Sequence, residues 1–154
     1  MNTMKKTYLF LCLLAALCMG CSKNSSTTST AFDLHNLQGE WLIVQLDSVP
    51  LHAEADEEVP NILFDVDNHS FACYIGCNRM GGTFSIEGDS LRLTDIYATR
   101  MYCPDKMDQE QRLGEVLEQV SSAEQTPDGN ILLSNPSHSN PSHTAQLTLT
   151  RPNN

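Results

Sequence analysis

The sequence predicts one α+β domain, in which an antiparallel β-meander packs against one main α-helix. Most apolar segments are short, rich in β-branched and aromatic residues, and separated by turn residues. Only one segment has its apolar residues at helical spacing. The chain has 154 residues, 40% of them hydrophobic, which suits a single domain of about 100–150 residues with extensions.

The N-terminus has the features of an export signal. Lys5-Lys6 precede an apolar run over residues 8–19, which is shorter than the ~20 residues needed to cross a bilayer as a helix. The run ends in Leu-Cys-Met-Gly-Cys, which resembles the lipobox of bacterial lipoproteins, with small Gly20 before the cleavage point. We therefore predict a lipoprotein signal peptide over residues 1–20 and lipidation of Cys21. An ordinary secretory signal is the alternative.

Residues 21–35 predict a flexible tether, because they are rich in Ser and Thr and have no apolar periodicity. Several acyl chains on Cys21 would hold the mature protein at the membrane, since two chains anchor stably where one binds only marginally. By similarity to other lipoproteins, Ser22 in place of a retaining Asp favours the outer membrane, and the lack of a following acidic run favours its periplasmic face. We expect a periplasm-facing outer-membrane lipoprotein.

The charge balance restricts the partners. The formal net charge is −10, and loss of Lys5-Lys6 with the signal leaves 7 of the 9 basic residues against all 19 acidic residues. Nucleic acid and anionic lipid head groups bind clustered Lys and Arg, so we predict no nucleic-acid binding and membrane contact only through the lipid. The acidic run at residues 54–58 lacks the spacing and the glycine of an EF-hand loop, which predicts a solvated loop.

Seven short segments have the composition and alternation of β-strands. Turn residues at Asp67-Asn68 and Gly88-Asp89 connect four of them, which predicts antiparallel neighbours with one face on the core and one in water. The predicted strands are residues 40–46, 61–66, 70–76, 83–86, 91–96, 130–133 and 145–150.

The helical segment has apolar residues at i, i+3, i+4 and i+7, and charged residues at the other positions. Asp105 follows a proline and is a suitable N-cap, so we predict a helix over residues 106–121. Gly114 in its interior costs about 1 kcal/mol relative to Ala, which predicts a close contact with the sheet. The apolar residues are Leu113, Val116, Leu117 and Val120.

Motifs for catalysis and cofactor binding are absent from the part that remains after cleavage. It has no Gly-rich phosphate loop, no Gly-x-Ser-x-Gly, no His-Glu-x-x-His and no Cys-x-x-Cys. His138 and His143 lie in a repeated Asn-Pro-Ser-His motif whose prolines predict a loop, and two imidazoles without a nearby thiolate or carboxylate make a weak metal site. We predict no enzyme activity, no cofactor and no metal.

Three thiols remain for disulfide formation after cleavage and acylation of Cys21. Cys73 and Cys77 lie four residues apart along the direction of a predicted strand, roughly 13 Å at ~3.3 Å per residue, whereas a disulfide requires Cα atoms within ~4.4–6.8 Å. Cys103 is therefore expected to pair with Cys73 or Cys77, which would contribute roughly 3.5 kcal/mol by closing a long loop. The residues alone leave both pairings open.

The region from residue 37 to 151 resembles the META domain of the HslJ-like family, a group of small bacterial envelope proteins. The resemblance implies a domain over residues 36–152, a strongly curved sheet forming a partly open barrel, and a Cys77–Cys103 disulfide that leaves Cys73 unpaired. The matching residues are Gly39, Trp41, Gly76, Cys77, Asn78, Gly81, Gly82, Thr99, Met101, Cys103, Glu110, Leu113, Leu117, Leu132, Leu133, Leu147, Leu149 and Arg151.

Several of these residues have structural interpretations. The matching glycines that follow residue 75 are expected in tight turns that return the chain beside Cys77. Asn78 is expected to satisfy buried backbone groups next to the disulfide. Trp41 is expected in the core, and Cys73, which has no histidine beside it, is expected as a buried small hydrophobe.

The functional hypothesis is a lipid-anchored, non-enzymatic envelope protein. Grooves lined by apolar residues bind ligands, so we expect a protein partner or a small apolar ligand on the concave side of the curved sheet. The family resemblance implies a connection with envelope or antibiotic stress. One alternative is a thiol-based redox protein that uses Cys73, and another is a purely structural or protective envelope factor.

Overall fold

A computed structural model of the protein describes residues 33–47, 49–88, 90–136 and 145–152. These described residues belong to one compact unit. The predicted signal peptide, Cys21, most of the tether, and His138 and His143 lie outside the described residues. The ordered domain begins before residue 36, because a short 3-10 helix, η1 (Leu34–Leu37), starts within the predicted tether.

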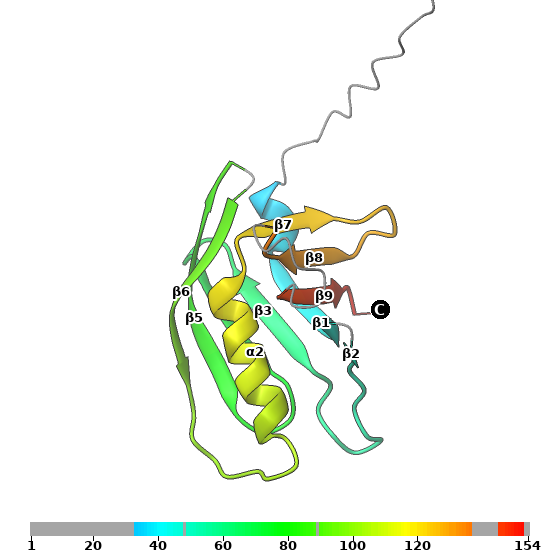
Figure 1. Ribbon diagram of the computed structural model, residues 1–154. Coiled ribbons are helices and arrows are strands. Elements are labelled where there is room, and N and C mark those ends of the chain that lie inside the picture. The colour runs from blue at the N-terminus through cyan, green and yellow to red at the C-terminus, as the bar shows by residue number, and fades with distance from the viewer. Residues whose placement is uncertain (1–32, 48, 89, 137–144, 153–154) are drawn as a thin grey trace, which may run out of the picture. The chain divides into compact units, whose positions relative to one another are not determined.

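The described chain folds into one antiparallel sheet with one α-helix. The strand order is β2-β1-β3-β4-β5-β6-β7-β8-β9, and an additional β1–β9 pairing joins the first part of the sheet to the last. Figure 1 shows this meander curving round α2. The elements are β1 (Gly39–Leu46), β2 (Val49–Pro50), β3 (Asn61–Asp65), β4 (Ser70–Tyr74), β5 (Arg79–Glu87), β6 (Ser90–Ala98), α2 (Met107–Gln119), β7 (Ser122–Gln125), β8 (Ile131–Ser134) and β9 (Gln146–Thr150).

The sheet closes into a partly open barrel, and its shortest strand pairing is the one between β6 and β7. These two strands pair only at Ser90 and Ser122, whereas β5 and β6 pair over most of their length. The connection between β6 and β7 contains α2, which packs against β6 at this opening (Figure 1). The predicted α+β fold, with a partly open barrel and one main helix, is confirmed.

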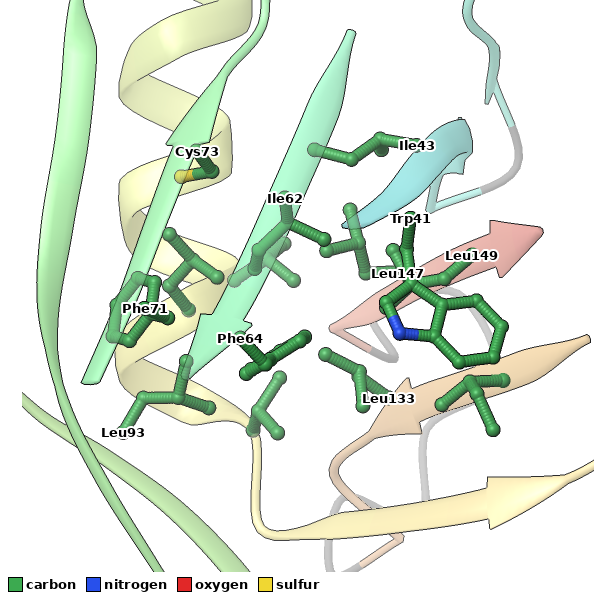
Figure 2. Close-up of a cluster of buried hydrophobic side chains, with 14 of the residues drawn as sticks. Trp41, Ile43, Ile62, Phe64, Phe71, Cys73, Leu93, Leu133, Leu147 and Leu149 are labelled. Carbon is green, nitrogen blue, oxygen red and sulfur yellow. The ribbon is translucent and has the colours of Figure 1, made fainter. Parts of the chain in front are cut away.

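The hydrophobic core fills the concave face of the sheet. Side chains from β1, β3, β4, β8 and β9 point toward one another in Figure 2, and α2 covers the remaining side. Trp41 is buried as predicted, with its indole N–H donating to the Leu37 carbonyl at 2.8 Å and the Arg151 guanidinium 3.8 Å from its ring centroid. Core side chains occupy most of this face, and the binding of a protein partner or a small apolar ligand on the concave side stays a prediction.

Helix α2 buries its predicted apolar stripe, but two predictions about it are wrong. Lys106 is the N-cap in place of Asp105 and makes no side-chain capping bond. The reason is a preceding turn, in which the Lys106 N–H donates to the Cys103 carbonyl at 3.0 Å. Gly114 makes no close contact with the sheet, since no heavy atom lies within 4 Å of the position that its Cβ would take.

The strands follow the predicted positions, with differences in length and number. β5 and β6 extend further than predicted, and β2 and β7 were not predicted because their residues show no apolar alternation. Gly81 and Gly82 lie within β5 and not in turns. A Cβ on Gly82 would lie 2.6 Å from the Thr94 carbonyl oxygen and 2.9 Å from the Phe71 ring, so glycine allows β6 to approach where the register of the two strands shifts.

Candidate functional site

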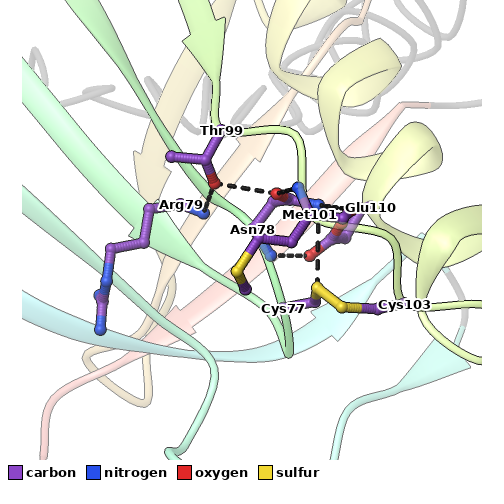
Figure 3. The surroundings of a disulfide bond; sticks show 7 residues. All are labelled: Cys77, Asn78, Arg79, Thr99, Met101, Cys103 and Glu110. Atoms are coloured by element: carbon purple, nitrogen blue, oxygen red, sulfur yellow. Dashed lines mark hydrogen bonds between the residues drawn. A yellow bond between two sulfur atoms is a disulfide. The ribbon is translucent and has the colours of Figure 1, made fainter.

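A disulfide joins the end of the β3–β4 hairpin to the connection between β6 and α2. Cys77 lies three residues after β4, Cys103 lies between β6 and α2, and their Cα atoms are 6.4 Å apart. Figure 3 shows the bond with the polar residues around it. This is the pairing that the family resemblance implied, and it leaves Cys73 as a free, buried thiol.

Asn78 holds the loop that carries Cys103. Its Oδ1 accepts hydrogen bonds from the Thr99 hydroxyl at 2.9 Å and from the Met101 N–H at 2.7 Å. Its Nδ2 donates to the Met101 carbonyl at 3.1 Å and to Glu110 Oε2 at 2.7 Å (Figure 3). The predicted role of Asn78, satisfying backbone groups beside the disulfide, is therefore confirmed.

Glu110 connects the first turn of α2 to the same point. Its carboxylate accepts one bond from the Asn78 backbone N–H and one from the Asn78 side chain. The residue is 5% exposed. The apolar periodicity placed Glu110 among the polar positions, yet it lies three residues before Leu113 and seven before Leu117, on the buried face. The spacing of Glu110 to these two leucines is the sequence feature that could have predicted its burial.

The residues of the family motif thus meet around the disulfide, with one exception. Gly76 has φ +146° and lies against the Lys106 side chain, so a Cβ there would be strained and would lie 2.9 Å from Lys106 Cδ. Thr99 Oγ1 accepts a bond from the Arg79 N–H at 3.1 Å, which ties the loop to the start of β5. Gly81 lies apart from this group, on β5, beneath the Tyr97 ring.

Exposed apolar side chains lie on the loop between β6 and α2, which the disulfide and Asn78 hold, and on the two flanks of this loop. Of the seven large hydrophobic residues that are exposed in the described part of the chain, four fall between residues 97 and 107. We call them the loop surface: Tyr97, Met101, Tyr102 and Met107, with Tyr102 the most exposed at 81%. The disulfide and the Asn78 hydrogen bonds hold the loop backbone around Met101 and Tyr102, while Tyr97 lies on β6 and Met107 begins α2.

A recess of about 310 Å³ opens beside the loop surface, between α2 and the ends of β5 and β6. Met80, Ile96 and Met107 are its apolar walls, and Glu110 is among its polar residues. Gly114 also lines it, on the helix side. The absent side chain of this glycine leaves the space over α2 open.

Cys73 lies away from any arrangement that would activate a thiol. It is 2% exposed on β4 and packs in the core (Figure 2). Burial raises the pKa of the Cys73 thiol to about 12, so the nucleophilic thiolate is scarce at neutral pH. The prediction of a buried small hydrophobe is confirmed.

The described residues contain no group of three or more His, Cys, Asp or Glu side chains arranged to hold a metal ion. In the acidic run, Glu57 and Glu58 form ion pairs with Lys106 and Arg79 at 3.2 and 2.7 Å on the surface. No helix among those described is long and apolar enough to cross a bilayer.

Comparison with known proteins identifies the domain. The profile of the META domain matches residues 33–151. The chain belongs to the META domain family. The match begins at Asp33, which caps η1 by accepting a bond from the His35 N–H.

Solved structures share the fold of this META domain at low sequence identity. One is an NMR structure of a protein whose sequence is 19% identical to this chain. The match covers 77% of this chain and 94% of the chain in that structure, with a TM-score of 0.59. An NMR structure of a protein from Burkholderia xenovorans is 14% identical, covers 86% and 99%, and has the same TM-score of 0.59. A crystal structure of a duf4847 family protein from Bacteroides vulgatus is 13% identical, covers 77% and 95%, and has a TM-score of 0.50. No curated protein matches the chain.

Proposed function

We propose that this META domain protein is a lipid-anchored, non-enzymatic protein of the bacterial envelope that binds a protein partner through the loop surface. The lipid on Cys21 would hold the domain at the membrane, and the tether would let it reach its partner. A role in envelope or antibiotic stress is part of the proposal and derives from the family resemblance.

The support for partner binding is the exposure of apolar side chains on a restrained loop and on the ends of the strand and helix that flank it. Tyr97, Met101, Tyr102 and Met107 keep between 42% and 81% of their surface in water. Clustered exposed apolar residues commonly mark interaction sites, and Tyr and Met are enriched in protein interfaces. A loop that is already ordered loses less entropy on binding, so the disulfide and Asn78 would favour affinity as well as stability.

Photocrosslinking in intact cells tests partner binding. A photoreactive phenylalanine analogue at Tyr102 should give a reproducible adduct with one envelope protein. The matched control is the same analogue at Val49, which is 61% exposed but lies on β2, outside the loop surface. Equal adducts at both positions, or none at Tyr102, would contradict the proposal.

Metabolic labelling with palmitate tests the anchor separately. The wild-type protein should incorporate the label and fractionate with outer membranes, and Cys21→Ala should do neither. A labelled Cys21→Ala protein would show that another residue carries the lipid.

The redox alternative is disfavoured by the burial of Cys73 and by the high pKa of its thiol. A purely structural role would leave the loop surface without a partner, which is the outcome that the crosslinking experiment detects.

A further inference from the structure

We propose that the recess between α2 and β6 binds the side chain of a lysine or arginine residue presented by the protein partner. The aliphatic stem would lie between Met80, Ile96 and Met107, and the cationic head would contact Glu110. This inference rests on the proposed function and specifies the chemistry of the partner at the loop surface.

The first observation is a buried carboxylate that has no cation beside it. Glu110 is 5% exposed, and none of the four ion pairs among the described residues includes it. Buried carboxylates are normally paired, because leaving water is costly for a charge. A carboxylate has about four lone-pair positions, and Asn78 uses two of those on Glu110. Glu110 therefore retains acceptor capacity for a cationic donor.

The second observation is the shape and lining of the recess beside this carboxylate. Its walls are apolar at Met80, Ile96 and Met107, while Glu110 and Asn78 supply polar atoms. Lys and Arg side chains match this arrangement, since they pack a hydrocarbon stem on apolar surface and carry the charge at the tip. The volume of about 310 Å³ is at the lower end of the ~300–1,000 Å³ typical of small-molecule pockets. It suits one side chain better than a whole apolar ligand.

The third observation is Gly114, which lines the recess from the middle of α2. Glycine is unfavourable in a helix interior, and at this position no neighbour requires it, because nothing lies within 4 Å of its missing Cβ. The recess supplies a reason for the glycine: a side chain here would occupy the space into which the partner residue enters.

The net charge of the chain favours the same kind of partner. With 7 basic residues against 19 acidic residues after loss of the predicted signal, the protein attracts basic segments over distance and repels acidic ones, including further copies of itself. A basic side chain on a partner protein is therefore the occupant that charge, shape and the unpaired carboxylate favour together.

The methionines of the chain provide the test. Of its six methionines, Met1, Met4 and Met19 lie in the predicted signal, so the mature form retains Met80 and Met107 in the recess and Met101 outside it. The acylated mature protein, labelled with ¹³C at the methionine methyl groups and held in detergent micelles, is titrated with Nα-acetyl-arginine amide and Nα-acetyl-lysine amide. Nα-acetyl-norleucine amide, which has the stem without the charge, is the matched control probe.

We expect the signals of Met80 and Met107 to shift with the two cationic probes and Met101 to shift less. The cationic probes should bind about tenfold more tightly than the norleucine probe, because a hydrogen bond to a charged group contributes that much. Glu110→Gln should remove the preference. Gly114→Leu should block all three probes while leaving Glu110 and Asn78 in place, and it covers the case in which Glu110→Gln does not fold.

Equal binding of the norleucine probe would overturn the inference in favour of an apolar pocket, and absence of shifts at Met80 and Met107 would overturn it outright. Neither result touches the crosslinking test at Tyr102. An adduct at Tyr102 without a response to the cationic probes would leave the proposed function standing and reject this inference alone.

Discussion

The side-chain amide of Asn78 bonds to Thr99, Met101 and Glu110 and so links the start of β5 to the loop and to α2. Removing it with Asn78→Ala would leave the Met101 backbone and the Glu110 carboxylate short of partners. Each buried group left unsatisfied costs about 1–3 kcal/mol. We expect the free energy of unfolding, measured by urea denaturation of the oxidised protein, to fall by about 3 kcal/mol.

Asn68→Ala is the matched control for Asn78→Ala. Asn68 is exposed in the β3–β4 turn, and its amide donates to the Asp65 carboxylate at the end of β3 at 2.7 Å. Its loss should lower stability by roughly 0.5 kcal/mol, as for other surface positions. A similar loss for both variants would show that the Asn78 bonds contribute little.

The Cys73 thiol predicts a pH dependence of stability. Burial raises its pKa in the folded state from 9.0 to about 12. The unfolded chain therefore releases the proton first as the pH rises, so the stabilisation is complete below pH ~9 and decreases by about 1.4 kcal/mol per pH unit up to the folded pKa. Comparison of wild type with Cys73→Ala between pH 8 and 11, by chemical denaturation under an inert atmosphere, isolates this contribution from other titrating groups. A stability difference that stays constant above pH 9 would contradict the assignment.

At the scale of single residues, the sequence identified roles that depend on near neighbours. The burial of Trp41 and Cys73 follows from their type, and the role of Asn78 follows from its place beside a cysteine. The burial of Glu110 was not predicted, because a carboxylate on a helix is normally assigned to the solvent face. Only the spacing to Leu113 and the distant amide of Asn78 explain its position.

At the scale of elements, α2 provides a test with a matched pair of glycines. Gly114→Ala should raise the free energy of unfolding by about 0.5–1 kcal/mol, because alanine is the better helix former and the Cβ meets open space. Gly82→Ala should lower it by about 1–3 kcal/mol, since the Cβ would press on the Thr94 carbonyl and the Phe71 ring. Thermal and urea unfolding of both variants measure the two changes. Destabilisation by Gly114→Ala would mean that the space over the helix is filled in solution.

The elements that could be predicted from the sequence are those whose buried residues recur at a regular spacing. β3, β4 and β9 alternate buried and less buried residues, and α2 repeats its buried residues at helical spacing, so local patterns were sufficient. β7 has only Ala123 buried and is held by its pairing with β8. The start of α2 is fixed by the turn after the disulfide, which no local capping signal describes.

At the scale of the molecule, the disulfide joins two cysteines that are 26 positions apart in the sequence and lie on either side of the β5–β6 hairpin. Replacing both partners by alanine, Cys77→Ala with Cys103→Ala, should lower the free energy of unfolding by roughly 3.5 kcal/mol on the chain-entropy model. Wild type unfolded with and without a thiol reductant should show the same difference. No difference in either comparison would mean that the hydrogen bonds of Asn78 suffice to order the loop.

The choice of Cys77 as the disulfide partner of Cys103 depends on the whole fold. Local geometry excluded a bond between Cys73 and Cys77 but did not choose a partner for Cys103, because the choice depends on which end of β4 faces the loop after β6. The closed order of the sheet, with β1 paired to β9, likewise depends on contacts between the two ends of the domain.

Crosslinking from position 102, with and without the disulfide, shows whether the restrained loop forms a binding surface. The photoreactive residue is placed at Tyr102 in wild type and in the variant that lacks both Cys77 and Cys103, in cells where the two proteins accumulate to the same level. We expect a partner adduct in wild type and loss of most of that adduct without the disulfide. An adduct of equal yield in both, or no adduct in wild type, would contradict it.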